Sequence, residues 1–145
     1  MEIEYPHELR YRCLECAMCC RDTPRRERRI LLTRSEATAI ASHTGLRPEK
    51  FCDDTGTAEP YTHAMKKVDG RCVFLRDEGC LIYTNRPLIC RFFPFYLEKQ
   101  DEGRFVFGVS EECPGVGRGP RLNRRFFYNL FRQAMISRGE SVLPL

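Results

Sequence analysis

The chain has 145 residues, of which 42% are hydrophobic and 30% charged, and its formal net charge at pH 7 is +4. This size allows one modest core, so we expect a single domain over residues 1–145. Glu2 and Glu4 interrupt the first residues, and no later stretch reaches the roughly 18 apolar residues that a membrane span needs. These features argue against a signal peptide and a membrane anchor, and we expect a cytoplasmic protein without a membrane partner.

In chain order, the sequence predicts a lead-in over 1–12, a cysteine-rich loop over 13–20, and then short strands and short helices. Strands are predicted over 29–33, 61–68, 72–75, 81–83 and 105–109, and helices over about 35–43, 48–53, 87–93 and 122–138. The last helix is the longest, because its apolar residues recur at a nearly helical period. We therefore expect a small α+β fold with short strands, short helices and a longer C-terminal helix, organised around cysteine metal sites.

Capping and turn residues mark several of these elements. Thr33 or Ser35 can cap the first helix, Glu36 follows Thr33 at the capping-box spacing, and Gly45 ends the helix. Asp69-Gly70 favours a tight turn between two paired strands. These local signals make the first helix and this turn the best-defined predictions.

The nine cysteines are a heavy load for a chain of this length. In an exported protein they would indicate a disulfide framework, but in a reducing compartment they favour metal ligands. Eight of them form the predicted ligand set: Cys13, Cys16, Cys19, Cys20, Cys72, Cys80, Cys90 and Cys113. Thiolates suit soft metals because the charged sulfur neutralises the cation and resists competition by water.

The spacing of the first four cysteines suggests how the ligands divide. Cys13, Cys16 and Cys19 follow one another in steps of three, so one loop can supply three ligands. The side chains of the adjacent Cys19 and Cys20 are expected to diverge and to serve two centres. By analogy with ferredoxin spacing, Cys113 before Pro114 is a candidate fourth ligand of the first set. The second set would be Cys20, Cys72, Cys80 and Cys90, and one or two centres are expected.

At these residues the sequence resembles the YkgJ-like cysteine-cluster family, described as the CxxCxxCC zinc- or iron-chelating domain. The resemblance spans about residues 13–117. It is carried by Cys13-x2-Cys16-x2-Cys19-Cys20-Arg21, Leu31-Leu32-Thr33, Gly70 to Leu75, Cys80 to Phe95, and Cys113-Pro114-Gly115. It implies metal chelation by the eight cysteines. Ala17 or Met18 stands where the family often has glycine, and Cys52 lies outside the family pattern.

Two kinds of metal centre remain open. Zinc ribbons join two C-x2-C knuckles, whereas Cys72, Cys80, Cys90 and Cys113 arrive singly here. Three close cysteines with a remote Cys-Pro favour an iron–sulfur cluster, possibly [4Fe–4S], over zinc. Similar domains occur in flagellin lysine N-methylases, so we expect an electron-transfer, cluster-delivery or modification-accessory role with a protein partner. The alternative is a zinc-stapled interaction module that binds nucleic acid or a macromolecular complex.

Other residues have weaker signals. Arg21, Arg86 and Arg91 lie next to predicted ligands and are candidates to offset their charge. Tyr83, Phe92, Phe93 and Phe95 are expected in the core or in a dry shell over the metal, and Cys52 in core packing on a short helix. The arginines of 21–29 and of 118–125 form basic runs that either bind a polyanion or face solvent. No catalytic arrangement stands out, and the sequence leaves enzymatic activity open.

Overall fold

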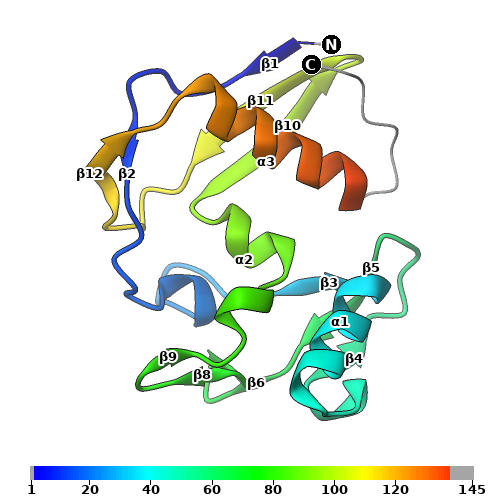
Figure 1. Cartoon of the computed structure of the whole chain (residues 1–145). Helices are drawn as coiled ribbons and strands as arrows, with labels where there is room; N and C mark the ends of the chain where they lie inside the picture. Colours follow the sequence, from blue (N-terminus) through cyan, green and yellow to red (C-terminus); the bar gives the residue numbers. More distant parts are fainter. Residues whose placement is uncertain (1, 138–145) are drawn as a thin grey trace. The chain divides into compact units, whose positions relative to one another are not determined.

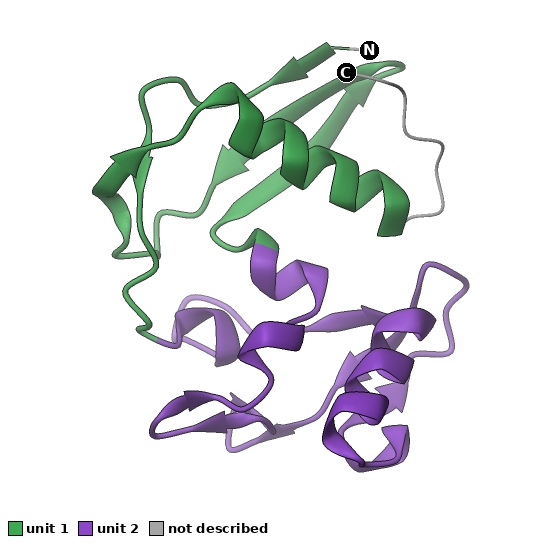
Figure 2. Cartoon of the chain, viewed as in Figure 1, with its two compact units in different colours: residues 1–16, 92–145 green, residues 17–91 purple. Residues whose placement is uncertain are grey.

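A computed structural model describes residues 2–137 of the chain (Figure 1). The chain divides into two compact units, coloured separately in Figure 2. Unit 1 contains residues 1–16 and 92–145, and unit 2 contains residues 17–91. The chain is a single domain if these units fold together and not independently, and this expectation stays a prediction. The mixture of helices and short strands confirms the α+β class.

Unit 1 is built on a three-stranded sheet with the order β1-β11-β10. The strands are β1 (Glu2–Glu4), β10 (Phe95–Asp101) and β11 (Arg104–Val109), and β1 runs parallel to β11 while β10 runs antiparallel to it. A second pair joins β2 (Arg10–Tyr11) to β12 (Val116–Arg121). The predicted strand over 105–109 is confirmed as β11, whereas β1, β2, β10 and β12 were not predicted.

The core of unit 1 is formed by α3 (Arg124–Ser137), which lies across β10 and β11 (Figure 1). Its buried stripe is Phe127, Leu130, Phe131, Ala134 and Met135. The Phe131 ring meets the Phe105 ring edge-on at 5.0 Å, and Phe127 meets Phe107 at 5.2 Å. The predicted C-terminal helix is confirmed, although it begins at Arg124 and residue 138 lies outside the described residues. No helix within residues 2–137 is long and apolar enough to cross a membrane.

Unit 2 contains a second three-stranded sheet, with the order β3-β5-β4. Its strands are β3 (Leu31–Thr33), β4 (Cys52–Asp54) and β5 (Tyr61–Met65). Two small hairpins follow, β6 (Lys67–Val68) with β7 (Arg71–Cys72), and β8 (Leu75–Arg76) with β9 (Gly79–Cys80). The helical segments are α1 (Arg34–Thr44), α2 (Leu88–Phe92) and the 3-10 turns η1 (Met18–Cys20), η2 (Pro48–Lys50) and η3 (Tyr83–Asn85).

The predicted caps of α1 are confirmed. The Thr33 hydroxyl accepts the Glu36 N–H at 3.2 Å, and the Glu36 carboxylate accepts the Thr33 N–H at 3.0 Å, which completes a capping box. Gly45 ends the helix in the left-handed region at φ 75°. The second carboxylate oxygen of Glu36 also accepts the Leu88 N–H at 2.6 Å. One side chain therefore caps α1 and anchors the start of α2, the helix that carries Cys90.

Two predicted elements of unit 2 are wrong, and a third, the strand over 72–75, is interrupted between the end of β7 at Cys72 and the start of β8 at Leu75. The helix predicted over 48–53 stops after the single turn η2, and Cys52 begins β4 instead, where it pairs with Met65. The strand predicted over 81–83 is a turn, since η3 begins at Tyr83. In both places a short apolar run was ambiguous between helix and strand, and pairing with distant residues decided the outcome.

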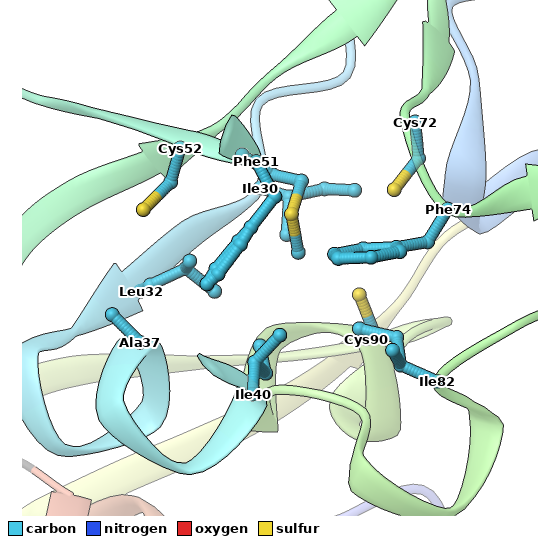
Figure 3. Packing of buried hydrophobic residues seen from close by; sticks show 11 residues of the cluster. Ile30, Leu32, Ala37, Ile40, Phe51, Cys52, Cys72, Phe74, Ile82 and Cys90 are labelled. Atoms are coloured by element: carbon cyan, nitrogen blue, oxygen red, sulfur yellow. The ribbon is translucent and has the colours of Figure 1, made fainter. Parts of the chain in front are cut away.

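A hydrophobic cluster fills unit 2 (Figure 3). Phe51 and Leu32 are fully buried at its centre, and the Phe51 and Phe74 rings pack 5.5 Å apart. Three cysteines belong to this cluster, namely Cys52, Cys72 and Cys90. Two predicted metal ligands, Cys72 and Cys90, are therefore part of the core of this unit.

Candidate metal centre

Five of the eight predicted ligands lie in unit 2: Cys19 and Cys20 in η1, Cys72 in β7, Cys80 in β9 and Cys90 in α2. Burial raises the pKa of the Cys72, Cys80 and Cys90 thiols, and the charge of Cys19 raises each of them further. For Cys20, the hydrogen bond to Cys19 is the largest cause of a raised pKa, followed by burial and by the charge of Cys19. The five sulfur atoms are therefore within electrostatic reach of one another.

Cys19 and Cys20 lie closer together than the sequence predicts. Their Sγ atoms are 3.7 Å apart, so the expected divergence of the two side chains is wrong. The cause is local: Ala17 takes the left-handed conformation at φ 66°, and the Cys20 N–H donates to the Ala17 carbonyl at 3.0 Å to form a tight turn. The left-handed conformation favours glycine, and here an alanine adopts it. That Cys19 and Cys20 bind two different centres stays a prediction, although the divergence on which it was based is absent.

Backbone donors surround two of the unit 2 thiols. Burial raises the Cys72 pKa, and backbone hydrogen bonds from Phe74 and Leu75 act against it. A backbone hydrogen bond from Ile82 likewise opposes the effect of burial on the Cys80 pKa. An N–H group directed at sulfur favours the thiolate, which is the form that binds metal. The backbone N–H groups of these two turns therefore favour the thiolate forms of Cys72 and Cys80.

Cys90 is buried about as deeply as Cys72, with 8% and 7% of the two residues exposed. Burial raises its pKa to about 12, with Arg28 acting in the opposite direction. In the view of Figure 3 the sulfur atoms of Cys72 and Cys90 lie on opposite sides of the Phe74 ring, each directed toward it. A bare thiolate would be costly there, and a bound cation would remove that cost.

Cys52 behaves as an ordinary buried thiol. It is 3% exposed and its Sγ donates to the Pro48 carbonyl at 3.3 Å. Its sulfur points away from Cys72 and Cys90 in Figure 3. Burial raises its pKa, which favours the protonated thiol. The packing role predicted for Cys52 agrees with these contacts, although they belong to a strand and not to a helix.

Two arginines offset the charge at the centre of the thiol group. The pKa of Cys19 is lowered to about 6, chiefly by the hydrogen bond from Cys20 and then, against the effect of burial, by the charges of Arg28 and Arg86. Arg86 is one of the three arginines that the sequence singled out. The other two make contacts that involve the backbone. Arg91 donates to the Arg86 carbonyl at 3.1 Å, and the backbone of Arg21 forms an isolated antiparallel β-bridge with that of Arg71. Arg28 was not predicted as a neighbour of the thiols.

The remaining three predicted ligands lie in unit 1. Cys13 and Cys16 are exposed, whereas Cys113 is buried. Burial raises the Cys113 pKa, Gly115 and Val116 lower it through backbone hydrogen bonds, and the charges of Cys16 and Cys13 raise it. These three thiols therefore form a second group, in which Cys113 has the same kind of backbone donors as Cys72.

Gly115 explains how the two ends of this second group meet. The Arg12 N–H donates to the Gly115 carbonyl at 3.2 Å, just before Cys13. A Cβ atom at Gly115 would lie 2.1 Å from the Arg12 carbonyl oxygen, closer than any two such atoms can approach. Glycine at this position therefore lets the strand before Cys13 pack against the turn after Cys113.

The donor set fits a soft metal, but the thiols are not drawn together. Within residues 2–137 no group of three or more His, Cys, Asp or Glu side chains already lies in a metal-holding arrangement. The Cys19–Cys20 separation of 3.7 Å nevertheless matches one edge of a tetrahedral site, which is about 3.8 Å for zinc–sulfur bonds of about 2.3 Å. Loading such a site requires the other thiols to close on this pair.

The aromatic residues near the Cys80–Cys90 loop pack elsewhere. Tyr83 is 47% exposed, and the Arg86 guanidinium lies 3.9 Å from its ring centre. Phe95 packs against Phe127 at 5.3 Å and Phe92 stacks on Phe107 at 5.8 Å, both inside unit 1. Phe92 and Phe95 therefore serve the core, which was one of the two predicted roles.

Comparison with known proteins adds a family. A family profile described as "Putative zinc- or iron-chelating domain" matches residues 12–114, a range that contains all eight predicted ligands. An uncharacterized protein of Methanocaldococcus jannaschii is 29% identical over 97 residues, which cover 65% of this chain and 50% of that protein. The chain thus spans about half the length of this curated relative. No solved structure matches the chain.

Proposed function

Because the chain belongs to the CxxCxxCC family of zinc- or iron-chelating domains, we propose that it binds a single thiophilic metal ion through the thiols of unit 2. The observation that carries this proposal is the Cys19–Cys20 pair, whose sulfur atoms are 3.7 Å apart. Two sulfur atoms at this distance can bind one ion together. In a [4Fe–4S] cluster each iron takes one cysteine, so two ligand sulfurs do not share a single metal.

The other ligands of this ion would come from Cys72, Cys80 and Cys90. These three thiols lie on two strands and a helix, so an ion held by Cys19, Cys20 and two of the three would connect three separate segments of unit 2. A four-coordinate ion needs four of the five thiols, and individual substitutions identify the fifth. Because two of these thiols belong to the hydrophobic cluster, binding the ion would stabilise the fold of this unit.

An iron–sulfur centre is the second candidate, and unit 1 favours it. Cys13 and Cys16 have ferredoxin-like spacing and Cys113 precedes Pro114. The charges of Cys16 and Cys13 raise the pKa of Cys113, so the three thiols lie near one another. Two of them are exposed, which suits exchange of electrons or of a cluster with a partner. An electron-transfer, cluster-delivery or modification-accessory role would follow from such a centre.

The nucleic-acid alternative has less support from the first basic run. Arg28 donates to the Cys19 carbonyl at 2.8 Å, and Arg26 donates to the Met18 carbonyl. Both side chains are half-buried, whereas Arg25 and Arg29 are exposed. Two of the five arginines of this run are thus directed at the η1 turn. Binding of a polyanion stays a prediction that rests on the exposed arginines.

Metal and acid-labile sulfide analysis of anaerobically purified protein, with an absorption spectrum, tests both candidates. One zinc or iron per chain without sulfide, lost in Cys72→Ser but kept in Cys113→Ser, is the result expected for the unit 2 ion. Iron and sulfide in equal amounts, lost in Cys113→Ser, would support the second candidate. A protein that binds neither metal after anaerobic reconstitution would contradict the proposal.

A further inference from the structure

Arg28 contacts two of the segments that carry the unit 2 thiols. Its Nε donates to the Cys19 carbonyl at 2.8 Å, and its Nη2 donates to the Ile89 carbonyl at 3.4 Å. The first carbonyl belongs to the η1 turn and the second lies beside Cys90 in α2. The planar guanidinium can make both contacts because its donors form a rigid fork. These bonds join the segments of Cys19 and Ile89, which lie 9 residues before and 61 residues after Arg28 in the sequence.

The backbone of Arg28 is anchored to a third segment. Its N–H donates to the Asp22 carboxylate at 2.6 Å, and Lys67 Nζ donates to the same oxygen at 2.9 Å. The Asp22 N–H donates to the Gly70 carbonyl at 2.7 Å. Asp22 therefore ties the Arg28 segment to the β6–β7 hairpin, which carries Cys72.

Charge gives Arg28 a second role. Four thiolates around a divalent ion leave a net charge of −2, because four negative charges meet two positive ones. Arg28 Nε lies 2.8 Å from the Cys19 carbonyl oxygen, so its positive charge is held beside a proposed ligand. The side chain is half-buried, so solvent screens it less than it screens an exposed arginine. Arg28 would therefore offset part of the negative charge of the loaded centre.

We propose that Arg28 is a positioning residue of the unit 2 metal centre: it holds the Cys19–Cys20 turn against the helix of Cys90 and offsets the charge of the bound ion. This inference rests on the proposed function of unit 2. Its matched control is Arg29, the adjacent arginine, which is exposed. The same change of charge at the two positions separates a local effect on the centre from a general effect of net charge.

The test compares Arg28→Gln, Arg28→Lys and Arg29→Gln in the reduced full chain. Zinc affinity is measured by competition with a chromogenic chelator, and the sulfur-to-metal charge-transfer bands are recorded after loading with Co²⁺. Arg28→Gln is expected to bind zinc about 10–100-fold more weakly, which is the usual effect of removing a group that orients metal ligands. Arg28→Lys should fall between this variant and the wild type, because lysine keeps the charge without the fork. Arg29→Gln should bind like the wild type.

A merely structural role is separated by melting each variant with and without zinc. We expect Arg28→Gln to lose more stability in the loaded protein than in the metal-free protein, and its Co²⁺ bands to shift. Equal losses in the two states, or wild-type zinc affinity in Arg28→Gln, would overturn the inference. Full recovery in Arg28→Lys would also overturn it, because charge alone would then suffice. If the wild type itself binds neither zinc nor Co²⁺, the proposed function fails instead.

Discussion

The two units place their thiols differently with respect to their cores. In unit 2, Cys72 and Cys90 are members of the hydrophobic cluster. In unit 1, the core is made of the α3 stripe and the rings of β10 and β11, and Cys13 and Cys16 are exposed. A metal bound in unit 2 would therefore be part of the core, whereas a metal bound in unit 1 would lie beside one that is already packed.

This difference teaches where metal and fold should be coupled. Within residues 2–137, unit 1 has eight aromatic ring contacts that involve Phe95, Phe105, Phe107 or Phe127. The unit 2 cluster includes one such pair, Phe51 with Phe74, and relies on short strands and turns. We therefore expect aromatic burial to hold unit 1 together without metal, and unit 2 to depend more on a metal bound by its thiols.

The largest effect is expected from a substitution that removes a ligand of the proposed metal centre in unit 2. Cys90→Ser removes a soft ligand from the dry interior and leaves a hydroxyl that binds these metals poorly. We expect loss of the unit 2 ion and a destabilisation of roughly 3–5 kcal/mol, because a structural metal contributes on the order of 10 kcal/mol in favourable cases. Metal counts and thermal melts measure both. Cys113→Ser, the buried thiol of unit 1, should keep that ion; the reverse pattern would contradict the assignment.

A second prediction sharpens the comparison from the side of unit 1. Gly115→Ala would put a Cβ 2.1 Å from the Arg12 carbonyl oxygen, so the segment before Cys13 must move. We expect a loss of about 2–3 kcal/mol and changed reactivity of Cys13 and Cys16 toward alkylation, with the unit 2 ion retained. Gly103→Ala is the control: its φ is +80° but nothing lies within 4 Å of the new Cβ, so it should cost about 1 kcal/mol. Equal costs for the two variants would refute the role of Gly115.

A third prediction concerns the carboxylate that joins two helices of unit 2. Glu36→Ala removes both the capping-box bond to Thr33 and the bond to the Leu88 N–H. We expect a loss of about 2 kcal/mol and weaker metal binding, since α2 carries Cys90. Glu59→Ala is the control, because its ion pair with Arg34 is exposed on both sides and should contribute under about 1 kcal/mol. Unfolding in urea measures the difference, and a Glu36→Ala variant as stable as the control would disprove the anchor.

The smallest effect is expected at Cys52. Cys52→Ser keeps a donor for the Pro48 carbonyl and changes little volume, so we expect a loss of about 1 kcal/mol and full metal content. Metal analysis of this variant beside Cys90→Ser tests the distinction between a packed thiol and a ligand. Loss of metal from Cys52→Ser would place this residue in the ligand set.

Local signals explain which parts of the fold could be predicted. Each of three features depends on residues only a few positions apart, and each was predicted correctly: the capping box of Thr33 and Glu36, the Asp69-Gly70 turn and the period of α3. The strand β1 has only three residues and pairs with β11 about a hundred positions away, as Glu2 opposite Arg104. Such short strands have no recognisable periodicity, so whether these residues form a strand depends on the distant strand with which they pair.

In the candidate metal centre, too, some features could be predicted from the sequence and others could not. Sequence motifs identify eight cysteines, but they place Cys19 with Cys13 and Cys16, whereas the boundary between the units falls after Cys16. The position of Arg28 was missed because its guanidinium binds the carbonyls of Cys19 and Ile89. Every residue has a backbone carbonyl, so such contacts leave no mark in the pattern of residue types.

Hydrogen exchange of the reduced protein, loaded with metal and after treatment with a chelator, tests the central claim most directly. Metal removal is expected to increase exchange by at least tenfold across the strands β3 to β9 and the helix α2 in unit 2. Exchange in α3 and β11 of unit 1 should change far less, because aromatic packing holds them. Equal increases in both units, or unchanged protection in unit 2, would contradict the account.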